Sequence, residues 1–218
     1  QTTRPVHRLA LVVGNANYPG PFIQLPACKN DADQMGTKLV SLGYELSGGR
    51  VWHDLSGKDL GEQLHDFICD VIQSKDMHAI LYFSGHGCTI KGKREPGLYG
   101  SDGIVAELRP LLSVYDRKIR PSEEDYLCII FDGGNSSDLA ASLVPRKNMF
   151  IMFPGVPFKP DPIAADGDTS IFTQYLLLAC QKDLDVIRIF RSAVASMPRS
   201  GRFPPSYREC LISSPCSL

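Results

Sequence analysis

The chain has 218 residues, of which 43% are hydrophobic, and its formal net charge is −1. This length and apolar content predict a single domain over residues 1–218 rather than two small ones. The near-zero charge argues against a protein that binds nucleic acid or anionic membranes. The sequence has no stretch of 18 apolar residues, so we expect no membrane span. No charged-then-apolar leader begins the chain, although Gln1 leaves open that a preceding segment was removed.

The seven cysteines predict reduced thiols rather than a disulfide framework. Their number is odd, they form no Cys-x-x-Cys pair and they lie inside apolar runs. This usage is typical of a cytoplasmic protein. Because the histidines and cysteines lack the spacing of metal ligands, we expect no metal site and no cofactor.

The hydrophobic pattern predicts strands that alternate with helices. We expect strands over 8–14, 44–52, 78–84, 126–131 and 149–153, the second of them interrupted at Gly48-Gly49. We expect helices from about 30 to 43 and over 56–72, 169–178 and 185–197, and the helix over 56–72 begins at a capping sequence. Between the third and fourth strands, we expect a small hairpin over 91–99 and a weakly helical segment over 104–114 that Pro110 limits.

This alternation predicts βαβ units and therefore an α/β fold. We expect a three-layer αβα sandwich, with a mostly parallel central sheet of about six strands and helices on both faces. The tail over 198–218 carries three prolines after Pro198 and at most one strand near 211–212, and we interpret it as leading to any domain that follows.

Two strand ends organise the chemistry. Residues 80–87 read ILYFSGHG and residues 128–135 read CIIFDGGN, so each is an apolar run closed by glycine. If the two strands are parallel, His86 and the Asp132-Gly133-Gly134 turn emerge at the same edge of the sheet, where open α/β sheets bind ligands. The separation of 48 residues between His86 and Gly134 is enough for one crossover connection.

These strand ends resemble those of the caspase-like cysteine peptidases, in which the histidine of a Gly-His-Gly turn precedes the nucleophilic cysteine by roughly 50 residues. In the paracaspase and metacaspase branches the cysteine strand ends Asp-x-Cys, whereas this chain has Asp132-Gly133-Gly134. The resemblance implies that His86 is the general acid and base, that position 134 is the nucleophile, and that backbone N–H groups of Gly87 and Gly134 form the oxyanion hole. Because glycine carries no thiol, we predict that this chain is inactive as an endopeptidase.

The resemblance covers about residues 6–215 and is closest to a paracaspase of the mucosa-associated lymphoid tissue type. Residues 167–176 resemble the family's glycine-then-Phe-x-x-x-Leu helix entry, and 207–211 resemble the end of a paracaspase domain. Family partners would be death-fold adaptors and ubiquitin ligases, bound through flanking regions, and family members pair as homodimers through an edge strand. The resemblance thus implies a cytoplasmic signalling protein.

Two acids carry the prediction of specificity. Residues 25–32 read LPACKNDA and resemble the Leu-x-Gly-Cys-x-Asn-Asp-Ala of the paracaspase and metacaspase branches, in which Asp31 and Asp132 would lie at the base of the pocket for the residue before the cut. Two carboxylates in one cleft suit the planar fork of an arginine. From the residues alone, Asp31 is equally an N-cap or first-turn acid, and Asp132 a turn former.

Two features of the pocket depart from relatives. Caspases proper use arginines to bind aspartate, and Arg4 and Arg8 do not match that pattern. Paracaspases carry a third acid after the fifth strand, whereas residues 154–157 read PGVP and contain none. The expected preference for arginine therefore rests on two acids only.

The origin of Gly134 stays open. It is either natural, which would make the chain a pseudopeptidase that acts as a scaffold in signalling, or an introduced Cys→Gly change in an active peptidase. A replacement thiol would have to come from Cys28, Cys88 or Cys128, and their positions argue against it.

Two other classes of protein share parts of this residue pattern. A receiver domain of the doubly wound type would be phosphorylated on Asp132, and a metal hydrolase would use His53, Asp54, His86 and Asp132. Neither class gives the glycine-flanked His86 and the Asp132-Gly133-Gly134 turn a joint role, so the caspase-like interpretation is preferred.

Overall fold

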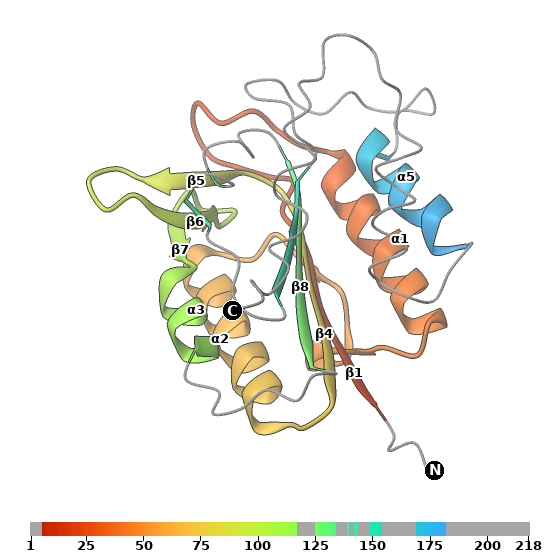
Figure 1. Ribbon diagram of the computed structural model, residues 1–218. Helices are drawn as coiled ribbons and strands as arrows, with labels where there is room; N and C mark the ends of the chain where they lie inside the picture. The colour runs from red at the N-terminus through yellow and green to blue at the C-terminus, as the bar shows by residue number, and fades with distance from the viewer. Residues whose placement is uncertain are drawn as a thin grey trace, which may run out of the picture.

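The computed structural model describes residues 6–116, 125–133, 139, 142–143, 149–153 and 169–181. A central sheet of six strands has the order β2-β1-β4-β8-β9, with β3 also paired to β1, and every pair in it is parallel (Figure 1). The strands are β1 (His7–Gly14), β2 (Glu45–Leu46), β3 (Trp52–His53), β4 (Met77–Ser84), β8 (Tyr126–Asp132) and β9 (Met149–Met152). The predicted parallel sheet of about six strands is confirmed.

Helices cover both faces of this sheet, as predicted. Helices α1 (Ala27–Ser41) and α5 (Ile171–Cys180) lie on one face, and α2 (Gly57–Gln73) and α3 (Arg109–Asp116) lie on the other (Figure 1). Successive side chains of β1 alternate between the two cores: Leu11 packs with α2, and Val12 packs with α1. Because both faces are buried, the central strands read as continuous apolar runs.

A small antiparallel sheet lies between β4 and β8 in the chain. It contains β5 (Gly87–Ile90), β6 (Glu95–Tyr99) and β7 (Val105–Glu107). A hairpin is confirmed, but it begins earlier than the predicted range 91–99, because its first strand is β5. The weak helix expected over 104–114 is wrong in its first half, which forms β7. Pro110 does not limit the helix that follows. It is the second residue of α3, within the first turn, where a missing backbone N–H costs no helical hydrogen bond.

The beginning of α1 changes the interpretation of Asp31. The helix begins at Ala27, three residues before the expected start, so Asp31 is neither the N-cap nor a first-turn acid and is instead buried. The predicted end is confirmed, since Gly43 follows the C-cap residue Leu42 with φ +84°.

Two other helices begin at serine caps. The Ser56 Oγ accepts a hydrogen bond from the Asp59 N–H at 3.1 Å, as the sequence predicts for α2. Helix α5 is capped by Ser170 rather than opened by Thr169. Within the described residues, no helix is both long and apolar enough to cross a bilayer. The predicted helix over 185–197 and the tail over 198–218 lie outside the described residues.

Candidate active site

Strands β4 and β8 end side by side at the carboxyl edge of the sheet. Ser84 is in register with Asp132, and the Gly85 N–H donates to the Asp132 carbonyl at 2.9 Å. A Cβ atom on Gly133 would lie 1.9 Å from the Gly85 carbonyl oxygen, so only glycine fits at position 133. The predicted nucleophile position, Gly134, follows directly but lies outside the described residues.

His86 is held at both its backbone and its ring. Its backbone N–H donates to the Tyr18 Oη at 3.0 Å, and its ring Nε2 lies 2.8 Å from the Ile23 carbonyl oxygen. Since a carbonyl oxygen can only accept, Nε2 carries the hydrogen and Nδ1 is the basic nitrogen of the neutral ring. Burial lowers the pKa of His86 despite the opposing bond to Ile23. The imidazole is therefore neutral near pH 7 and able to accept a proton.

Aromatic side chains pack around this imidazole. The ring centroid of His86 lies 4.6 Å from that of Tyr18 and 5.8 Å from that of Phe22. Tyr18, Phe22 and Ile23 all come from the segment between β1 and α1, for which the sequence analysis predicts no functional role. The available signal was two aromatic residues in a loop that leaves the carboxyl edge of the sheet, where parallel sheets bind ligands.

Gly87, the predicted oxyanion donor, begins β5 directly after His86. It is buried, and a Cβ atom at this position would lie 3.0 Å from the Leu139 Cδ2. The absence of a side chain at Gly87 therefore lets β5 pass close to the side chain of Leu139.

The structure brings Asp31 and Asp132 together under the beginning of α5. Their exposed fractions are 1% and 2%. The Asp31 Oδ1 accepts the Ser170 N–H at 2.8 Å, and the Asp132 Oδ2 accepts the hydroxyls of Ser170 at 2.5 Å and Thr173 at 2.6 Å. Burial, followed by repulsion from Asp132, raises the pKa of Asp31 to about 8, and burial also raises the pKa of Asp132. The pair therefore retains a proton near neutral pH.

Sequence reasoning missed the residues that surround this pair. Tyr82 is completely buried in β4, and its hydroxyl donates to the Asp132 Oδ2 at 3.2 Å. Thr173 lies in α5 and Ser170 is its N-cap residue, 41 and 38 positions away from Asp132 in the chain. No local pattern marks them as partners of an acid, apart from the usual place of serine at a helix start.

The two rival classes do not fit this geometry. Asp132 is buried and already accepts hydroxyl groups, so it is not open to a phosphodonor. The four residues considered for a metal hydrolase have separate partners: the His53 Nε2 lies 2.9 Å from the Asp33 Oδ1, Asp54 pairs with Lys29, and His86 bonds to a carbonyl. Among the described residues, no three metal-ligating side chains converge.

None of the three candidate thiols resembles an activated nucleophile. Cys128 is 0% exposed and Cys28 is 6% exposed, and Cys88 is half-buried in β5. Burial raises the pKa of all three thiols. A thiol with a raised pKa carries little thiolate, the form that attacks a carbonyl.

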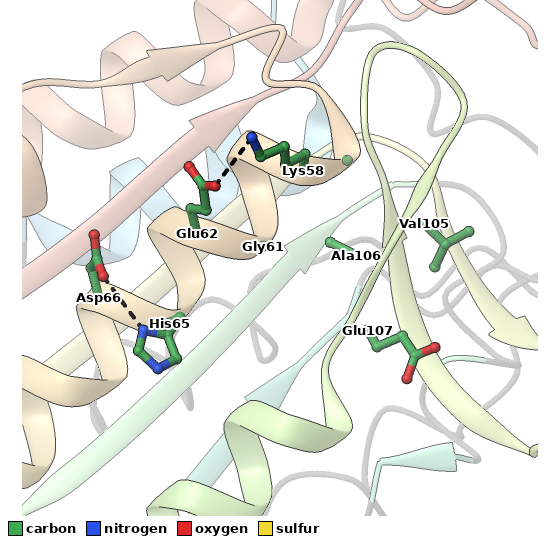
Figure 2. A pocket seen from close by; sticks show the side chains of 9 residues that line it. Lys58, Gly61, Glu62, His65, Asp66, Val105, Ala106 and Glu107 are labelled. Carbon is green, nitrogen blue, oxygen red and sulfur yellow. Dashed lines mark hydrogen bonds and ion pairs between the residues drawn. The ribbon is translucent and has the colours of Figure 1, made fainter.

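A groove of about 530 Å³ lies elsewhere, between α2 and β7 (Figure 2). Its polar lining is already engaged in part: Lys58 pairs with Glu62 at 3.7 Å, and His65 pairs with Asp66 at 3.4 Å. No predicted site residue lines it. The candidate site is thus the strand-end cluster around His86 rather than this groove.

A parallel αβα sandwich with a glycine-flanked histidine at one strand end, and an Asp-Gly turn at the next, defines a domain of the caspase fold. The sequence profile of the caspase domain family matches residues 7–210, and the chain belongs to this family of cysteine peptidase domains.

Comparison with solved structures agrees on the fold. The crystal structure of the Drosophila initiator caspase Dronc is similar, with a TM-score of 0.59 at 12% sequence identity, over 85% of this chain and 70% of that chain. A search of curated protein sequences gives no significant match.

Proposed function

We propose that this caspase-family domain is of the paracaspase or metacaspase type, that it binds peptides containing arginine, and that it does not cut them. The observation that carries the proposal is Gly134, which stands two residues beyond Asp132 just as His86 stands two beyond Ser84 in the paired strand. A scaffolding role in cytoplasmic signalling would follow from binding without hydrolysis.

The proposed inactivity follows from what glycine lacks. With a cysteine at position 134, the His86 Nδ1 would take the thiol proton and later deliver it to the leaving amine, while the N–H groups of Gly87 and residue 134 would hold the oxyanion. With glycine, the backbone N–H remains but no atom can form the acyl intermediate. Only binding and oxyanion terms are left, and these give orders of magnitude less catalysis.

The proposed preference for arginine rests on the pair Asp31 and Asp132. Both carboxylates are covered by Ser170 and Thr173, so a guanidinium reaches them only if the beginning of α5 moves aside. Binding also requires the pair to lose its retained proton, because a bidentate partner needs ionised oxygens. Affinity for arginine should therefore rise as pH increases through about 8, the raised pKa of Asp31.

An activity assay tests the missing nucleophile. A fluorogenic peptide with arginine before the bond is incubated with the chain as given, with Gly134→Cys, and with Gly134→Ala as the matched control that adds a side chain without a thiol. We expect cleavage with Gly134→Cys only. Cleavage by the unchanged chain would refute the proposed inactivity, and no cleavage by folded Gly134→Cys would refute an otherwise intact peptidase site.

A binding assay tests the acid pair independently of chemistry. Fluorescence anisotropy compares an arginine peptide with the same peptide carrying citrulline, which is nearly isosteric and neutral. We expect the arginine peptide to bind more tightly at about pH 9 than at about pH 6, and Asp31→Asn to weaken it. Equal affinity for the two peptides would show that Asp31 and Asp132 do not bind the positive charge of the arginine side chain.

The same proposal extends to partners. Death-fold adaptors and ubiquitin ligases would bind through flanking regions, and a homodimer would form along β9, which is the last strand of the described central sheet. Sedimentation of the chain at increasing concentration tests the dimer, and Phe150→Arg in β9 should shift the equilibrium toward monomer. Phe150 is partly buried in this strand.

A further inference from the structure

We infer that Tyr18 is a positioning residue for His86, and that residues 16–25 form a closed clasp that sets the orientation of the imidazole. This inference rests on the proposed function to the extent that His86 is treated as the catalytic base. The geometric part of the inference stands on the contacts of the clasp itself.

The clasp is closed by the side chain of Gln24 together with one backbone hydrogen bond. The Gln24 Nε2 donates to the Tyr18 carbonyl at 2.6 Å, and the Gln24 Oε1 accepts the Tyr18 N–H at 3.0 Å, so one amide satisfies both backbone groups of Tyr18. The Leu25 N–H donates to the Ala16 carbonyl at 2.9 Å and completes the closure. This segment, in which Pro19 and Pro21 oppose a regular element, is held in one conformation by these bonds.

The clasp is also tied to the sheet. The Asp54 Oδ1 accepts the N–H groups of Ala16 at 2.8 Å and of Asn17 at 3.1 Å. Although partial burial opposes ionisation, the bonds from Lys29 and from these N–H groups hold the pKa of Asp54 below its usual range. The anchoring carboxylate is therefore charged throughout the neutral range.

Two groups of this one clasp contact His86 from different directions. The Tyr18 Oη accepts the backbone N–H of His86, and the Ile23 carbonyl accepts the hydrogen of the ring Nε2. Tyr18 is 5% exposed, and burial raises its pKa, so its phenol stays neutral and cannot place a charge beside the imidazole. The backbone and the ring of His86 are thus both held by hydrogen bonds to the same clasp.

The fit of the neighbouring glycine supports the same assignment. A Cβ atom on Gly85 would lie 2.6 Å from the Tyr18 Oη, so the strand end approaches the phenol more closely than another residue type would allow. With the Nε2 hydrogen directed to Ile23, Nδ1 is the nitrogen presented for proton transfer. Loss of the clasp should let the ring reorient and should mix the two neutral tautomers.

The first test uses the chain as it exists and requires no activity. Tyr18→Phe keeps the aromatic ring but removes the acceptor, and Gln24→Ala opens the clasp without touching the phenol. In both variants, we expect amide exchange of His86 to become about tenfold faster, because one hydrogen bond or its support is lost. We also expect the ¹⁵N shifts of the His86 ring to move from the Nε2–H tautomer toward a mixture.

Tyr44→Phe is the matched control. It removes another buried hydroxyl, which lies 2.6 Å from the Tyr126 Oη at the opposite edge of the sheet, and it should leave both His86 signals unchanged. A folded Tyr18→Phe or Gln24→Ala protein with unchanged tautomer and unchanged exchange at His86 would overturn the inference.

The second test uses the Gly134→Cys background. There, Tyr18→Phe should lower kcat about tenfold, the scale of one hydrogen bond, and leave KM within about twofold, whereas Tyr44→Phe should change neither. An inactive Gly134→Cys protein combined with the expected NMR changes would refute the proposed peptidase ancestry of the site and leave the positioning role intact. A kcat unaffected by Tyr18→Phe in an active Gly134→Cys protein would refute the catalytic part of the inference.

Discussion

His86 and the pair Asp31–Asp132 lie at the ends of neighbouring strands, yet the structure treats them in opposite ways. His86 is half-buried and is contacted by acceptors: its ring Nε2 donates to the Ile23 carbonyl, and its backbone N–H donates to the Tyr18 hydroxyl. The carboxylates are covered completely and are contacted by donors from α5. One site is oriented and reachable, and the other is closed.

Burial nevertheless moves both sites toward the neutral form. It lowers the pKa of His86 and raises that of Asp31 to about 8, because a low-dielectric surrounding disfavours whichever form is charged. A count of charged residues therefore overstates the charge at this edge of the sheet. For a base the neutral form is the useful one, whereas an arginine site needs its acids ionised, so opening the closed site has a cost that the oriented site does not have.

The largest expected effect concerns the point at which the two sites meet. Gly133→Ala would place a Cβ atom 1.9 Å from the Gly85 carbonyl, a backbone atom that cannot rotate away. We expect the free energy of unfolding to fall by at least about 3 kcal/mol in urea denaturation. Gly61→Ala is the control, since no atom lies within 4 Å of its Cβ position, and it should stabilise α2 by up to about 1 kcal/mol. Equal effects of the two changes would mean that the strand ends are not in close contact.

A second prediction concerns how the stability contributed by the closed acid site depends on pH. Because the folded-state pKa of Asp31 is raised above its unfolded value, its contribution to stability is complete below about pH 4 and is lost as pH rises through about 8. Asp31→Asn mimics the protonated acid and should remove this loss, so the variant should be the more stable protein at about pH 9.

Urea unfolding at about pH 5 and about pH 9 measures this difference. Asp66→Asn on α2 is the control. The Asp66 side chain is 70% exposed, so this variant should gain no stability over the unsubstituted chain at about pH 9. If the stability of the unsubstituted chain rose between these pH values relative to that of Asp31→Asn, the raised pKa of Asp31 would be contradicted.

The smallest effect compares two helix caps. The Ser170 Oγ accepts the Thr173 N–H at 3.0 Å and donates to the buried Asp132, whereas the half-buried Ser56 Oγ caps α2 and donates to the exposed Asp59 carboxylate at 2.7 Å. We expect Ser170→Ala to cost about 2 kcal/mol and Ser56→Ala about 1 kcal/mol, measured by thermal or urea unfolding. If the two costs were equal, the hydroxyl of Ser170 would contribute nothing to the closed acid site.

The sequence by itself determined the layers of the fold and the two strand ends. Continuous apolar runs mark strands buried on both faces, Ser56 and Asp59 mark the start of α2, and Gly43 marks the end of α1, because each of these signals lies within a few neighbouring residues. The same local patterns placed His86 and Asp132 at strand ends, which share one edge of the sheet because β4 and β8 pair in parallel.

Only the tertiary structure decided how the site residues are held. Tyr18 contacts His86 across 68 positions of the chain, and Asp31 contacts Ser170 across 139 positions. Periodicity and capping describe neighbours along the chain and are silent about such pairs. The closed state of the acids and the orientation of the imidazole depend on burial and on long-range hydrogen bonds, which exist only after the strands and helices have packed.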